Sequence, residues 1–115
     1  MLADKDRIFR NLYGQGDWGL AGARARGAWD GTKAIIEKGR DGLVNEMKAS
    51  GQRGRGGAGF PTGIKWRTVH DAPGPQKYIV CNADEGDSGS FSDRMVMEGD
   101  PFMLIEGMKI GRAHV

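Results

Sequence analysis

The chain has 115 residues, 20 of them glycine, and 17 Lys and Arg balance 15 Asp and Glu. This length and a hydrophobic share of 38% suggest a fragment, or a piece that folds with help, and no apolar run approaches the roughly 20 residues of a membrane span. The single cysteine, Cys81, excludes an internal disulfide and any multi-cysteine metal or iron–sulfur site within the chain.

Charge is divided unevenly along the sequence. Residues 1–71 hold 13 basic and 8 acidic residues, whereas residues 72–115 hold 4 and 7. Neither part contains a block of five or six like charges, so nothing reads as a nucleic-acid-binding tail. No signal peptide is visible at the N-terminus, and a reducing, cytoplasmic setting is the default expectation.

The first half of the chain predicts loops and short helices. Residues 11–31 are glycine-punctuated and predict a loop with short turns, which Trp18 and Trp29 would pin down. A weak helical pattern over residues 29–38 has Asp30 or Thr32 as its cap and ends at Gly39. Asp41 is then expected to cap a second helix, which carries Leu43, Val44 and Met47 on one face and ends at Gly51.

The second half predicts one strand between two helices. Thr62 is a candidate N-cap for a short helix through Trp66, and residues 70–77 form a turn-rich connector, where His70 is a solvated side chain. Residues 78–81 form a continuous apolar run, which predicts a strand buried on both faces, with Cys81 as a small buried side chain. Asp93 is a possible cap for a helical turn, and Pro101 begins a last helix over residues 101–110. One strand cannot make a sheet, so the sheet would be incomplete.

Residues 54–59, Gly-Arg-Gly-Gly-Ala-Gly, form what we call the glycine loop. They fit the spacing G-x-G-x-x-G, but a helix rather than a strand is predicted before them, which argues against the Rossmann fingerprint. Glycines without Cβ still allow backbone N–H groups to approach phosphate oxygens, and Arg55 and Lys65 add positive charge. A flexible linker and an RGG-type nucleic-acid-binding segment remain the alternatives.

Residues 82–92, called the acidic loop, follow the predicted strand directly. The spacing argues against a calcium loop, because Asp87 occupies the sixth position, where glycine is required. Carboxylates and an amide at a strand end suit ligand hydroxyls, because ionised carboxylates accept hydrogen bonds. A solvated acidic turn is the alternative. A phosphate-binding loop and a hydroxyl-accepting loop together favour a nucleotide-like ligand.

These motifs resemble a known family. Residues 54–63 with Lys65 and Trp66, then Asn82 to Glu85 with Gly89, Asp93 and Arg94, are similar to the flavin- and NADH-binding subunit of NADH:quinone oxidoreductase. Residues 11–31 and 85–108 look closest to the beta subunit of NAD-dependent formate dehydrogenase. The resemblance runs from about residue 8 to the end.

The resemblance implies an α/β fold: the N-terminal part of a Rossmann-like FMN-binding domain at residues 41–115, after an N-terminal extension at residues 1–40. Two groups of ligand contacts would follow. The implied FMN contacts are Gly54, Arg55, Gly56, Lys65, Asn82, Asp84, Glu85 and Gly86, and the implied NAD(H) contacts are Gly57, Ala58, Phe60, Lys65 and Asp87. No metal ligand and no acid–base catalyst is assigned, because the flavin carries the chemistry.

The implied activity is hydride transfer between NAD(H) and FMN, in a formate dehydrogenase or alternatively in a respiratory NADH:quinone oxidoreductase or an NAD-reducing hydrogenase. The implied partners are a 2Fe-2S thioredoxin-like subunit and a catalytic subunit, without nucleic acid or membrane insertion. A 4Fe-4S cluster would belong to a C-terminal segment that this chain lacks. Thr68 stands where the family usually has an aromatic residue, so an inactive remnant that binds no cofactor is an alternative of another class.

Overall fold

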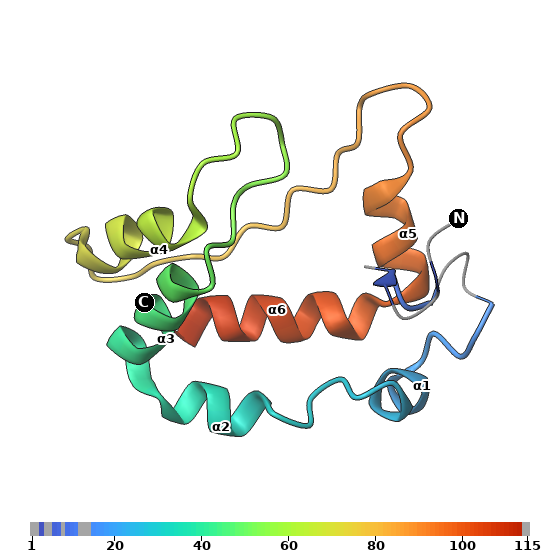
Figure 1. The fold of residues 1–115 in the computed structure, drawn as a ribbon, viewed down its shortest axis with the longest axis horizontal. Helices are drawn as coiled ribbons and strands as arrows, with labels where there is room; N and C mark the ends of the chain where they lie inside the picture. Colours follow the sequence, from blue (N-terminus) through green and yellow to red (C-terminus); the bar gives the residue numbers. More distant parts are fainter. Residues whose placement is uncertain (1–2, 4–5, 8, 12–14, 114–115) are drawn as a thin grey trace. The chain divides into compact units, whose positions relative to one another are not determined.

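The computed structural model describes residues 3, 6–7, 9–11 and 15–113. This part of the chain contains six α-helices (Figure 1): α1 (Leu20–Ala25), α2 (Thr32–Glu37), α3 (Gly39–Ala49), α4 (Thr62–Asp71), α5 (Ser92–Gly99) and α6 (Pro101–Ala113). Over the same ranges the only β pairing is an isolated antiparallel bridge between Arg53 and Pro61. None of these helices combines the length and apolarity that a membrane crossing requires.

The chain divides into two compact units, each built from separated stretches of sequence. Unit 1 comprises residues 1–31 and 80–108, and unit 2 comprises residues 32–79 and 109–115. Their sequences differ in charge: unit 1 holds 6 basic and 11 acidic residues, a net charge of −5, and unit 2 holds 11 and 4, a net charge of +7. The glycine loop belongs to unit 2, and the acidic loop belongs to unit 1.

Unit 2 is organised by the packing of α4 on α3. Leu43 and Val44 of α3 are buried, as the spacing of apolar residues predicts. Gly63 lets the start of α4 lie directly on the end of α3, because a Cβ at this position would be 2.5 Å from Lys48 Cα. Farther along, Arg67 Nη1 donates to Asp41 Oδ1 at 2.9 Å. This joint fixes where the chain between the two helices begins and ends.

Unit 1 is held by a polar network rather than by a large apolar core. The side chains of Asn11 and Asp100 are buried, and Ala23 is the one buried apolar side chain described in this unit. Asn11 N donates to Asp100 Oδ2 at 3.2 Å, and Asn11 Nδ2 donates to the Gly99 carbonyl at 2.7 Å. Arg26 forms an ion pair with Asp100 at 2.7 Å. Residues far apart in the sequence are thereby tied to the junction of α5 and α6.

Several helix boundaries differ from the sequence prediction. The residues before α3, α4 and α5 are Lys38, Pro61 and Phe91, so Asp41, Thr62 and Asp93 lie inside the helices they were expected to cap. The prediction of Pro101 at the start of the last helix is confirmed. Helix α4 also runs through Asp71, so His70 sits in a helix, where its Nδ1 lies 2.7 Å from Asp71 Oδ1.

Helix α1 lies within residues 11–31, which were predicted to be loop. The sequence prediction missed this helix because its glycines lower helix propensity. Gly22 is required there by packing, since a Cβ would lie 2.1 Å from the Asp17 carbonyl oxygen.

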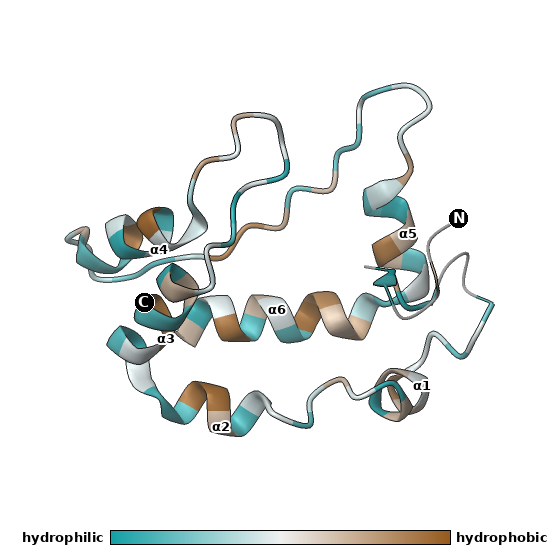
Figure 2. Cartoon of the chain, in the orientation of Figure 1, coloured by the Kyte–Doolittle hydropathy of each residue, from teal (hydrophilic) through white to brown (hydrophobic). Residues whose placement is uncertain are grey.

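The strand predicted at residues 78–81 is not formed, and the prediction that it is buried on both faces is wrong. Tyr78 and Val80 are 73% and 84% exposed, and Cys81 is also exposed. A strand needs a hydrogen-bonded neighbour, and the chain leading from α4 to α5 pairs with none in the described ranges. Figure 2 shows apolar colour in this connection, whereas in α6 apolar and polar colours alternate along the helix.

Candidate functional site

The glycine loop is a short span closed at its base. Gly54 N donates to the Phe60 carbonyl and Thr62 N donates to the Gln52 carbonyl, both at 2.9 Å. Together with the bridge between Arg53 and Pro61, these bonds make a stem that leads straight into α4. In Figure 1 the chain between α3 and α4 projects away from the ends of these two helices. The linker alternative therefore does not describe this segment, since its two ends are paired.

The backbone of the glycine loop is open to approach. A Cβ placed on Gly56, Gly57 or Gly59 would meet no other atom within 4 Å. Gly57 and Gly59 have φ of 126° and 61°, which side chains of L-residues rarely adopt. Nothing in the described chain packs against these three positions, so their backbone is left accessible. Accessible N–H groups of this kind form anion-binding concavities in proteins.

Positive charge flanks the glycine loop. The side chains of Arg55 and Lys65 are exposed, and Lys65 Nζ lies 5.7 Å from the centre of the Phe60 ring. The first turn of α4 contains no acidic residue, and no side chain caps it. The Thr62, Ile64 and Lys65 amides already donate to carbonyls, so this helix start contributes the positive end of its dipole. The loop, the two cations and the helix start together can bind an anionic group such as a phosphate.

Two further residues in this region have structural explanations. Thr68 Oγ1 donates to the Ile64 carbonyl within α4 at 3.0 Å, so this side chain is turned onto its own helix. It offers no ring to oppose Phe60, which is 46% exposed. His70 and Arg67 lower the pKa of Asp71: the hydrogen bond from His70 is the main cause, and it outweighs the opposing effect of desolvation. This group braces α4 and lies apart from the loop.

The acidic loop presents two of its five predicted ligand residues as exposed carboxylates. Asp84 and Asp87 are exposed, and Asn82 Oδ1 accepts a hydrogen bond from Asp84 N at 3.2 Å. A Cβ at Gly86 would lie 3.2 Å from Asp84 Oδ2, so glycine leaves room for that carboxylate. Acceptors so arranged suit hydroxyl groups. No cluster of metal-ligating side chains is present over the ranges the structure describes.

Glu85 is used within the chain. Its Oε1 accepts from Asp93 N at 2.9 Å and its Oε2 accepts from Arg94 N at 3.0 Å, which caps α5. The hydroxyls of Ser90 and Ser92 also donate to Oε1. Desolvation is the largest single effect on the pKa of Glu85 and would raise it, but these hydrogen bonds together lower it. Sequence reasoning placed Glu85 among the ligand contacts and did not identify this capping role.

The structure therefore assembles the predicted residues in two groups. Gly54, Arg55, Gly56, Gly57, Ala58, Phe60 and Lys65 belong to the glycine loop and its flanks in unit 2, and Asn82, Asp84, Glu85, Gly86 and Asp87 belong to the acidic loop in unit 1. Sequence reasoning missed Arg53, whose Nη1 donates to the Gly59 carbonyl at 2.9 Å. The one sequence feature that could have indicated this role is its position directly before the glycine loop.

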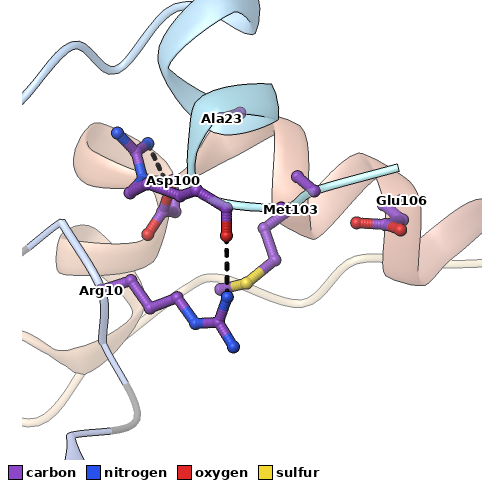
Figure 3. Close-up of a pocket in the computed structure, with 8 residues that line it drawn as sticks. Arg10, Ala23, Asp100, Met103 and Glu106 are labelled. Atoms are coloured by element: carbon purple, nitrogen blue, oxygen red, sulfur yellow. Dashed lines mark hydrogen bonds and ion pairs between the residues drawn. The ribbon is translucent and has the colours of Figure 1, made fainter. Parts of the chain in front are cut away.

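Unit 1 also contains a cavity of about 200 Å³ beside the polar network (Figure 3). Its lining includes Arg10, Arg26, Asp100 and Glu106. Arg10 Nη1 donates to the Arg26 carbonyl at 2.9 Å, and Glu106 Oε1 accepts from Trp29 N at 3.0 Å. Since Arg26 pairs with Asp100 while Arg10 and Glu106 are bonded to backbone groups, the cavity belongs to the packing of this unit. No local pattern predicts it, because its members lie up to 96 positions apart, from Arg10 to Glu106.

Comparison with known proteins identifies the family of this chain. Residues 47–115 match the family described as the Nuo51 FMN-binding domain. The chain belongs to this family. It is 58% identical over 111 residues to an NADH-quinone oxidoreductase subunit of Rhizobium meliloti, an alignment that covers 96% of this chain and 26% of the relative. The prediction that the chain belongs to the flavin-binding subunits of this oxidoreductase family is thereby confirmed.

Mitochondrial proteins are similar as well. The flavoprotein 1 of NADH dehydrogenase (ubiquinone) from Dictyostelium discoideum is 57% identical over 92% of this chain and 22% of its own length. The 51 kDa subunit of NADH-ubiquinone oxidoreductase from Neurospora crassa is 49% identical over 97% of this chain and 24% of its own length. The chain thus spans about a quarter of the length of these curated relatives. None of the three is a formate dehydrogenase, so the finer resemblance gains no support from them.

Proposed function

We propose that the chain contributes the glycine loop and the acidic loop of an FMN site in the flavin-binding subunit of an NADH:quinone oxidoreductase, where a hydride moves between NAD(H) and FMN. The observation that carries this proposal is the open backbone at Gly56, Gly57 and Gly59 beside two exposed cations. A flat ring or a phosphate can approach such a backbone closely, and FMN has both. The bound flavin would supply the hydride chemistry, and the chain would bind and orient it.

The residues present fit such a ligand. Gly54, Arg55, Gly56 and Lys65 would hold the phosphate or the ring edge, and Asn82, Asp84 and Gly86 would face the ribityl hydroxyls. Glu85 would contribute through the fold of the acidic loop. Gly57, Ala58, Phe60 and Asp87 would serve NAD(H). Because Thr68 offers no ring, adenine stacking would rest on Phe60 alone, and we expect weak affinity for NADH.

The respiratory assignment replaces the formate dehydrogenase assignment as our first choice. The three relatives are subunits of NADH-quinone or NADH-ubiquinone oxidoreductases and NADH dehydrogenase. In such an assembly the chain would have partner subunits that carry electrons onward, among them a 2Fe-2S thioredoxin-like subunit. Its location would be cytoplasmic. We also propose that residues 41–115 contribute to an α/β domain in which residues 78–81 pair as a strand with a neighbour.

The test uses a glycine whose replacement the chain itself tolerates. A Cβ added at Gly56 would have no atom within 4 Å, and this residue has no positive φ, so Gly56→Val should fold as the parent does. The chain is titrated with FMN, and flavin fluorescence reports binding. NADH is then added without oxygen, and loss of the yellow colour reports hydride transfer. Gly107→Ala is the matched control, because Gly107 is equally open but lies in α6.

We expect the parent and Gly107→Ala to bind FMN and Gly56→Val to bind at least tenfold more weakly, which corresponds to about 1.4 kcal/mol. The glycine loop has no role in flavin binding if Gly56→Val binds FMN as the parent does. A parent chain that stays colourless with FMN in excess would instead favour the inactive-remnant alternative.

A further inference from the structure

The backbone of the glycine loop has few restraints of its own. No neighbouring atom lies close to the Cβ positions of Gly56, Gly57 or Gly59, so packing does not hold these residues. Below them, the stem is held by the hydrogen bonds of Gly54 with Phe60 and of Thr62 with Gln52. Glycine has more conformational freedom to lose than any other residue. A loop that must present its backbone in one arrangement therefore needs a restraint from a side chain.

Arg53 provides such a restraint. Arg53 lies at the base of the loop, on one side of the stem. Its Nη1 donates to the Gly59 carbonyl on the opposite side of the stem at 2.9 Å. The acceptor residue, Gly59, has a φ of 61°. Glycine adopts several other backbone conformations about as readily, so its own preference does not hold this one. A guanidinium donor gives a stronger hydrogen bond than a neutral one, and its planar shape fixes direction as well as distance.

The bond to Gly59 also orients the next N–H group. The peptide between Gly59 and Phe60 is planar, and the described chain contains no cis peptide. Its carbonyl and its N–H therefore point in opposite directions, so holding the Gly59 carbonyl against Arg53 turns the Phe60 N–H away from the guanidinium. Arg53 thus sets a peptide plane at the end of the loop that adjoins α4.

We infer that Arg53 is a positioning residue: it pre-forms the ligand-binding backbone of the glycine loop through the Gly59 carbonyl and does not bind the phosphate itself. This inference rests on the proposed function. Binding to a pre-formed loop avoids the ordering of several residues at the moment of binding, and that ordering otherwise weakens affinity.

The experiment compares the chain with Arg53→Ala and with Arg40→Ala, which removes an exposed cation from α3 of the same unit. Two ligands are titrated: FMN, and riboflavin, which has the same ring and ribityl chain but no phosphate. Loss of a positioning residue should weaken the binding of both ligands by a similar factor, about tenfold. Loss of a phosphate contact should weaken the binding of FMN alone.

A second readout needs no ligand. Hydrogen exchange is measured at the Gly54 amide, which closes the stem, and at the Ser50 amide, which donates to the Glu46 carbonyl at the end of α3. We expect Arg53→Ala to speed exchange at Gly54 and to leave Ser50 unchanged, and Arg40→Ala to change neither.

The inference is overturned if Arg53→Ala binds FMN more weakly but binds riboflavin with unchanged affinity. It is also overturned if the exchange rate of the Gly54 amide is the same in Arg53→Ala as in the parent. It is also overturned if Arg53→Ala binds both flavins as the parent does, and in that case the proposed function stands. If the parent chain binds neither flavin, the proposed function fails and the positioning role fails with it.

Discussion

Glu85 adopts a backbone conformation that few glutamates adopt, with a φ of 47°. Four donors converge on its carboxylate, two from the backbone of α5 and two from serine hydroxyls. Such a conformation persists where surrounding interactions impose it. The residue therefore links the course of the acidic loop to the start of α5, and the exposed Asp84 and Asp87 depend on it for their placement.

The pH dependence of this cap can be predicted in sign. The pKa of Glu85 is lowered on folding from its ordinary 4.5, so the carboxylate stabilises α5 fully above about pH 4.5 and the stabilisation is lost as the pH falls through the lower folded pKa. We expect the Asp93 and Arg94 amides to exchange faster across that range. Glu85→Gln should exchange rapidly at both amides even at pH 7. Equal protection of these amides in the parent and in Glu85→Gln at pH 7 would contradict the capping role.

At the level of elements, the joint between α3 and α4 decides where the glycine loop stands. A methyl group at Gly63 would come within 2.5 Å of Lys48 Cα and 2.8 Å of Lys48 N, and backbone atoms cannot move aside as a flexible side chain can. Gly63→Ala should therefore destabilise unit 2 by about 1–3 kcal/mol, measured by denaturant unfolding. Gly107→Ala, in open space on α6, should be neutral or stabilising by about 0.5–1 kcal/mol. Equal stability of the two variants would show that the joint is not tight.

Sequence patterns predicted those elements whose causes are local. The apolar face of α3 and Pro101 at the start of α6 follow from spacing and from the fixed φ of proline. The glycine loop and the acidic loop were found for the same reason, because their residues are contiguous. The strand at residues 78–81 was predicted from composition, but pairing is a property of two segments. The cap by Glu85 and the brace by Arg53 escaped prediction because each depends on a turn that brings residues six to nine positions apart together.

At the scale of the whole molecule, the polar network of unit 1 connects residues that lie 74 to 89 positions apart. Asn11→Ala would remove the side-chain bonds to Gly99 and Gly16 and leave the buried Gly99 carbonyl unpaired, with a loss of about 1–3 kcal/mol. We expect hydrogen exchange to accelerate in α5 and at the start of α6, while α3 and α4 are unaffected. Gln15→Ala, at an exposed position nearby, is the control. Uniform loss of protection in both units would show that the network is not confined to unit 1.

The division of charge between the units has a consequence for the approach of an anionic ligand. Unit 2 carries a net charge of +7 and unit 1 carries −5, and each contains one of the two loops. The field of a protein acts on a mobile ion well before contact. A dianionic phosphate is attracted by unit 2 and repelled by unit 1, whereas neutral hydroxyls are indifferent to either sign. The net charge of unit 2 therefore favours the arrival of an anionic group at that unit before any hydrogen bond forms.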